Sequence, residues 1–134
     1  MSNLLNLKKG NAWKTAKTHN FDVDNGSGTT VDEVLIVPQY PITVVGARAV
    51  PNTTTIATGG SAATVQLGIT LGGAEIVAAT NLVGSTNGSV GTELNLTIVS
   101  GSVAAGNPVF VRHTGRAATV AGEYFVEIDY TGND

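Results

Sequence analysis

The sequence predicts an all-β protein: an antiparallel β-sandwich of jelly-roll-like type with an extended N-terminal arm. Thr (18), Val (17), Gly (17) and Ala (15) make up half of the 134 residues. Thr and Val are β-branched and suit pleated strands, and Gly supplies turns. Only 13% of the residues are charged, so few are suited to solvated helix faces. From Val31 onward, short alternating segments are separated by turn residues.

The clearest strand is expected over Thr64–Leu71, where apolar and polar residues alternate with a period of two. This period gives the strand one dry face, which includes Leu71, and one polar face. Gly72 and Gly73 follow, and they permit the positive φ values of a hairpin turn. We therefore expect a return strand over Glu75–Ala79.

The same pattern predicts five further strands. In the last of them, Tyr124 and Tyr130 should face inward and Phe125 outward. One hydrophobic face per strand calls for a second sheet to cover it, which a β-sandwich or jelly roll provides. The expected ranges are 31–37, 42–50, 93–99, 109–113 and 123–130.

Charge divides the chain into two parts. All four lysines lie in the first seventeen residues, and no acidic residue precedes Asp22. The later part carries ten carboxylates and three arginines, a formal charge of −7. Such asymmetry usually concerns partners rather than the fold. We expect an N-terminal arm and polar linker over residues 1–30 and a β-sandwich domain over residues 31–134.

The arm carries the candidate contacts to a partner. Trp13 suggests that the arm docks on something, because a solvated tail does not need a Trp; the alternative is that Trp13 folds back onto its own sandwich. The remaining candidates are three leucines and the four lysines: Leu4, Leu5, Leu7, Lys8, Lys9, Lys14 and Lys17.

Motifs for catalysis or cofactor binding are not found in the sequence. The chain has no Cys and two distant histidines, so the usual metal-ligand spacings do not occur. Phosphate-binding loops and a nucleophile elbow are also absent. We therefore expect a non-enzymatic protein without a metal or cofactor.

Composition also bears on larger partners. The acidic later part argues against a nucleic-acid partner, although four lysines and a Trp in the arm could hold phosphates weakly. No apolar run approaches the ~20 residues of a membrane helix. The start, MSNLLNLKKG, lacks the order of a signal peptide, so we expect a soluble protein made without secretion and no membrane partner.

Arg112 and Arg116 form the basic cluster of the later part, with His113 between them. An anion site and a subunit interface are two interpretations. A third is structural: if strands 109–113 and 123–130 pair as a hairpin, both arginines lie near Glu123, Glu127 or Asp129. Opposite charges across such a pair contribute ~0.2–1 kcal/mol.

Sheet edges give a further hint about partners. Monomeric sandwiches often protect exposed edges with Lys or inward-facing charge, but the region after residue 30 contains no Lys. We expect neighbouring copies or another protein to cover some of these edges.

Three segments resemble the small capsid decoration (cement) proteins of tailed bacteriophages: TVQLGITLGGAEIVAA, VAAGNPVFVRHTG and the closing GEYFVEIDY. The resemblance covers residues 40–130 in composition and strand order, and residues 1–20 in layout. It implies a β-sandwich or jelly roll with an extended arm.

The resemblance also implies a non-enzymatic virion protein on the capsid exterior, assembled in the host cytoplasm. Such proteins are commonly trimers that bridge capsid subunits and stabilise the head against packaged DNA. Carried over, the leucines and Trp13 would be apolar anchors on the major capsid protein, and the lysines would meet its carboxylates. The arm would add to a sheet of that protein.

A second interpretation remains open, namely a phage fibre or tail domain or a carbohydrate-binding sandwich. Sugar sites usually present aromatic platforms, whereas this chain has seven aromatic residues in all.

Overall fold

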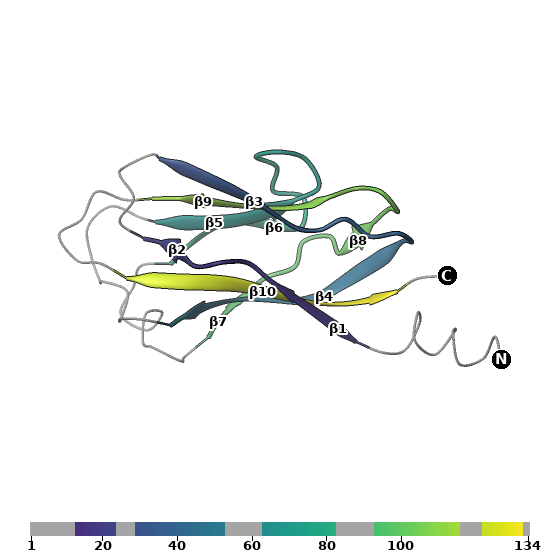
Figure 1. Cartoon of the computed structure of the whole chain (residues 1–134), viewed down its shortest axis with the longest axis horizontal. Coiled ribbons are helices and arrows are strands. Elements are labelled where there is room, and N and C mark those ends of the chain that lie inside the picture. Colours follow the sequence, from purple (N-terminus) through teal and green to yellow (C-terminus); the bar gives the residue numbers. More distant parts are fainter. Residues whose placement is uncertain (1–12, 24–28, 53–62, 83–92, 116–121, 133–134) are drawn as a thin grey trace.

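A computed structural model describes residues 13–23, 29–52, 63–82, 93–115 and 122–132 of the chain. These residues form two antiparallel sheets packed face to face, which confirms the predicted β-sandwich (Figure 1). The first sheet contains β1 (Lys14–Lys17), β2 (Phe21–Asp22), β4 (Ile42–Pro51), β7 (Leu94–Leu96), β8 (Ser102–Val103) and β10 (Glu123–Gly132). The second sheet contains β3 (Thr30–Ile36), β5 (Thr64–Gly68), β6 (Val77–Asn81) and β9 (Val109–Thr114).

The strand pairing has the order of a jelly roll. The pairs are nested: β5 pairs with β6, β4 with β7 and β8, β3 with β9, and β1 and β2 with β10. The chain thus runs as one long hairpin that is folded over on itself. Pairing of β10 with β4 and of β9 with β5 then joins these strand pairs into the two sheets. This arrangement is the two-sheet jelly roll, and it decides between the sandwich types that the sequence left open.

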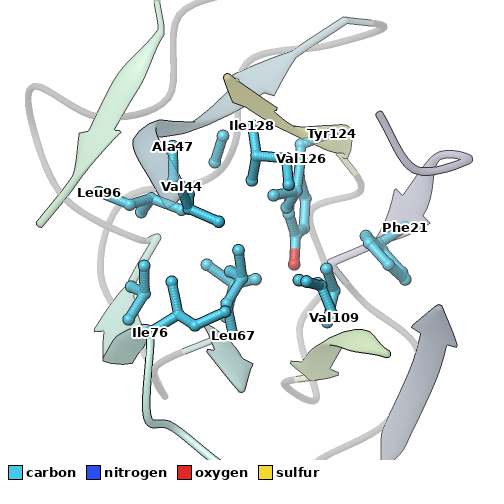
Figure 2. Packing of buried hydrophobic residues seen from close by; sticks show 14 of the residues in the cluster. Phe21, Val44, Ala47, Leu67, Ile76, Leu96, Val109, Tyr124, Val126 and Ile128 are labelled. Carbon is cyan, nitrogen blue, oxygen red and sulfur yellow. The ribbon is translucent and has the colours of Figure 1, made fainter. Parts of the chain in front are cut away.

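The core lies between the sheets and follows the predicted alternation. In β10, Tyr124, Val126 and Ile128 are fully buried. Figure 2 shows these three side chains facing Leu67 and Val109 of the second sheet. Because β10 and β4 form the longest ladder, the first sheet is built around them.

Two predicted features at the Gly72–Gly73 turn were wrong. β5 ends at Gly68 instead of Leu71, and Leu71 is 65% exposed. The cause is a close approach: the backbone of Gly73 lies where a Cβ on Gly68 would be, so the chain turns back over the sheet at that point. The Glu75 carboxylate holds the turn by accepting hydrogen bonds from the Ile69 N–H (2.9 Å) and the Thr70 hydroxyl (3.0 Å).

Part of the expected arm belongs to the sandwich. β1 pairs with β10 from Lys14↔Tyr130 to Lys17↔Glu127, and β2 continues along the same strand. Phe21 and Val23 are buried in the core. The sequence did not predict β1 and β2, because this stretch has no sustained period, nor did it predict the two-residue β8.

Gly101 is required where the chain passes β4. Its carbonyl accepts the Val44 N–H at 2.8 Å, and a Cβ on Gly101 would overlap the carbonyl oxygen of Val44. We expect Gly101→Ala to destabilise the protein by about 1–3 kcal/mol, because backbone must move to relieve the overlap. Urea unfolding measures this.

The control for this prediction is Gly46→Ala. Its Cβ would be in ordinary contact with Asp129, at 3.4 Å from Oδ2, so its effect should stay within about 0.5 kcal/mol. Equal stability of the two variants would contradict the close-approach argument.

Candidate docking surface

One end of the sandwich is mainly apolar, and we call it the apolar end. Two connections form it: 37–41 between β3 and β4, and 104–108 between β8 and β9. β1 begins and β10 ends there (Figure 1). Neither of these two connections contains a charged residue. Such a surface is suited to contact with another apolar surface.

Exposed side chains and two hollows shape the apolar end. Trp13 is 66% exposed and Val37 46%. The Tyr40 hollow has a volume of about 170 Å³, and the more open Asn107 hollow about 430 Å³. The Tyr40 hollow is lined by Ile36, Val37, Pro38, Gln39, Tyr40, Ile42 and Tyr130. The Asn107 hollow is lined by Pro41, Ile42, Ile69, Ser102, Val103, Ala104 and Asn107.

Lys14 ties the start of β1 to the rim of the Tyr40 hollow. Its Nζ donates a hydrogen bond to the Tyr40 hydroxyl at 3.0 Å and lies 5.8 Å from the centre of that ring. The hydrogen bond raises the pKa of Lys14 above 10.5, so the side chain is charged at neutral pH. Lys14 also pairs in register with Tyr130, another lining residue.

Lys17 lies on a different face. Its Nζ is 5.2 Å from the centre of the Phe125 ring, and Phe125 is an outward residue of β10. Lysines on an edge strand normally protect it from pairing with other strands. Here the ammonium groups of both β1 lysines lie near aromatic rings of the same chain.

The predicted site residues divide into two groups. Trp13, Lys14 and Lys17 lie on or next to β1, and Trp13 and Lys14 belong to the apolar end. Trp13 is exposed, so its ring is not folded onto the sandwich, and its docking role stays a prediction. The others lie outside the described residues: Leu4, Leu5, Leu7, Lys8, Lys9 and Arg116.

The predicted pairing of Arg112 across a hairpin of 109–113 with 123–130 was wrong, because β9 and β10 lie in different sheets. Arg112 instead binds Asp32 of β3 through Nε (2.8 Å) and Nη2 (2.9 Å). This bidentate pair lowers the pKa of Asp32. An interface role for Arg112 stays a prediction.

The carboxylates expected to face Arg112 are bound by Arg48 of β4. Its guanidinium donates hydrogen bonds to Glu127 (2.8 Å) and to both carboxylate oxygens of Asp129 (2.8 and 3.2 Å). Arg48 could be placed on an outward position of a predicted strand, but its partners lie about 80 residues away in the sequence.

His113 does not belong to the basic cluster, because it is fully buried. Its Nδ1 shares a hydrogen bond of 2.5 Å with the Tyr124 hydroxyl, and its ring stacks on Phe21 at 5.6 Å. Burial lowers the pKa of His113 to about 4, against an opposing effect of the Asp22 backbone. Its Nε2 has no hydrogen-bond partner among the described residues.

Metal-ligand clusters and membrane-spanning helices are absent from the described ranges. Nowhere in them do three or more His, Asp or Glu side chains come together as metal ligands. None of the described segments forms a helix long and apolar enough to cross a membrane. The apolar end is therefore the candidate functional surface that these residues present.

Comparisons with known proteins establish the fold. No protein-family model and no curated protein sequence matches the chain. A chain in the structure of the capsid asymmetric unit of cyanophage Pam1 is similar, with a TM-score of 0.62 and 17% identity over 93% of this chain and 87% of that chain. At this identity, the likeness shows a shared fold.

Two other structures are more distant. A chain of Bacillus endospore appendages, described as disulfide-linked pili, has a TM-score of 0.36 and 17% identity over 93% of this chain and 91% of that one. A chain of infectious bursal disease virus, Gx strain, has a TM-score of 0.33 and 8% identity over 92% of this chain and 33% of that one. Scores this low add nothing to the argument.

Proposed function

We propose that this protein is a non-enzymatic structural protein of a phage virion that binds the outer surface of the capsid. The observation that carries the proposal is the apolar end, with exposed Trp13 beside the point where the basic N-terminal segment enters the sheet. The shared fold with a chain of a cyanophage capsid supports it. Its location would be the capsid exterior and its partner the major capsid protein.

The contact would combine two parts. The apolar end would provide a surface around Trp13 and Val37, which are 66% and 46% exposed. Residues 1–12 would extend to a neighbouring capsid subunit, with Leu4, Leu5 and Leu7 as anchors and Lys8 and Lys9 near carboxylates. Binding two subunits at once would bridge them and stabilise the head, because linked contacts reinforce one another.

Pelleting with undecorated phage heads tests the proposal. The wild-type chain should sediment with the heads. Trp13→Ala should weaken binding at least tenfold, since an exposed aromatic at the centre of a contact often contributes 2 kcal/mol or more. Deletion of residues 1–12 should weaken binding further, and more strongly at low salt, where lysine contacts count most.

Val31→Ala is the control, because Val31 is 41% exposed but lies near the opposite end, in register with His113. Its binding should equal that of the wild type. Glycan binding without head binding would replace the proposal with the carbohydrate-binding or fibre alternative.

We further propose that the protein works as a homo-oligomer, with a trimer favoured. In the described part of the chain, both lysines lie on β1, so the edge strands β6 and β7 lack the lysines that often protect sheet edges. Subunit contacts along such edges would cover them. Sedimentation equilibrium tests this, and a compact monomer at high concentration would exclude it.

A further inference from the structure

The Tyr40 hollow lacks an apolar occupant among the described residues. Of its seven lining residues, six are aliphatic, proline or aromatic, and Gln39 is the amide. Its volume is about 170 Å³, which suits an aliphatic side chain better than a large polar group. Apolar walls of this kind gain free energy when apolar atoms replace water.

The chain itself brings leucines to the rim of this hollow. Lys14 bonds Tyr40 at 3.0 Å and pairs with Tyr130, so two of the lining residues contact the start of β1. Leu7 is seven residues before Lys14, a reach of at most ~25 Å for an extended chain. A segment tethered so closely has an effective concentration of ~mM at the hollow, which a second copy does not reach in dilute solution.

We infer that, in the free protein, a leucine side chain of residues 4–7 of the same chain occupies the Tyr40 hollow. The occupant is aliphatic, its linker is short, and Lys14 fixes the point from which the linker starts.

Binding of a leucine in the hollow does not require the proposed function, but its consequence for capsid binding rests on that proposal. If the same leucines also anchor the arm on the capsid, docking must first release them. The apparent affinity for the capsid is then reduced by the fraction of molecules in which the leucines are bound to the hollow.

Disulfide trapping tests the inference on the isolated full-length chain, which has no native Cys. The test variant is Asn6→Cys/Gln39→Cys; it keeps all three leucines and every apolar lining residue, and Gln39 is exposed. The control is Asn6→Cys/Ala79→Cys, since Ala79 is exposed on β6 at the far edge of the second sheet. Mild oxidation at micromolar protein should link the test pair within one chain at least ten times faster than the control pair.

A third variant separates docking from mere proximity. With Leu4→Ser, Leu5→Ser and Leu7→Ser added to the test pair, the rate should fall to that of the control. Equal rates for test and control, persistence of the fast rate without the leucines, or disulfide-linked dimers would each overturn the inference. Because no heads are used, the result does not depend on whether the protein binds a capsid.

Discussion

His113→Leu is expected to remove most of the pH dependence of stability between about pH 6.5 and pH 4. His113 is fully buried against Phe21 and Tyr124, and burial lowers its pKa from 6.5 to about 4. The folded protein therefore binds a proton on His113 less readily than the unfolded chain does. One pKa unit corresponds to about 1.4 kcal/mol, so the wild type should lose about 3 kcal/mol across this range.

The sign of the effect follows from linkage. Between pH 6.5 and 4, the unfolded chain holds a proton that folded His113 does not, so stability falls as the pH falls. Above pH 6.5 the free energy of unfolding is not reduced by His113, and below pH 4 the reduction that His113 causes is complete. Asp32, Asp129 and Glu75 have lowered pKa values, so their contributions are lost as the pH falls below the unfolded values, 3.8 for the two aspartates and 4.5 for Glu75.

Urea unfolding at pH 7, 6, 5 and 4.5 measures the prediction. His113→Leu should show a nearly flat profile in this range, but with lower stability at pH 7, since the Tyr124 hydroxyl loses its partner at a cost of about 1–3 kcal/mol. The matched control is His113→Leu/Tyr124→Phe, which should be equally flat and recover much of that loss. An unchanged slope in His113→Leu would show that other groups cause the acid sensitivity.

Arg48→Ala is expected to cost about 2–3 kcal/mol at neutral pH. The Arg48 guanidinium binds Glu127 and Asp129 of β10, and Glu93 lies at 3.4 Å. The side chains of Arg48, Glu127 and Asp129 are only 18–23% exposed. Without Arg48, neighbouring carboxylates on one strand would face each other with no cation between them.

The pH dependence gives a second readout. Arg48 and the Thr15 hydroxyl lower the pKa of Asp129 below 3.8, so the wild type keeps this stabilisation above that pH and loses it as the pH falls further. In Arg48→Ala, protonation instead relieves repulsion. The gap in unfolding free energy between wild type and variant should therefore narrow below about pH 4.

Arg112→Ala is the matched control, because it removes an arginine–carboxylate pair on the second sheet. Arg112 binds a single carboxylate, Asp32, and its side chain is 29% exposed. Its loss should lower the free energy of unfolding much less than the loss of Arg48 does, because solvent screens exposed ion pairs. Equal costs for the two variants would mean that the three-carboxylate cluster on the first sheet adds nothing beyond a surface ion pair.

Local patterns explain what could be predicted. Inward positions such as Tyr124, Val126 and Ile128 were predicted correctly, because alternation along a strand assigns side chains to faces without knowledge of the partner strand. The end of β5 was wrong by three residues, because the backbone approach of Gly73 to Gly68 is a contact across a turn. β1 and β2 were missed, because their short pairing with β10 leaves no period in the sequence.

The candidate surface was only partly predictable. Trp13, Lys14 and Lys17 could be singled out from their types and their place in the chain. The hollow next to them could not be predicted, because Tyr40 and Tyr130 lie 90 residues apart in the sequence. They meet because β4, which follows Tyr40, pairs with β10, which contains Tyr130.

The sequence alone determined the fold class and the inward faces of the main strands, because composition and a period of two are local properties. It also determined the charge split between a basic start and an acidic remainder. The tertiary structure decided that the sandwich is a jelly roll, that Arg48 and not Arg112 binds Glu127 and Asp129, and that His113 is buried beside Tyr124. It also placed Trp13 and Lys14 at the rim of an apolar hollow. These outcomes depend on which strands lie side by side, and strand order is set by packing between segments far apart in the chain.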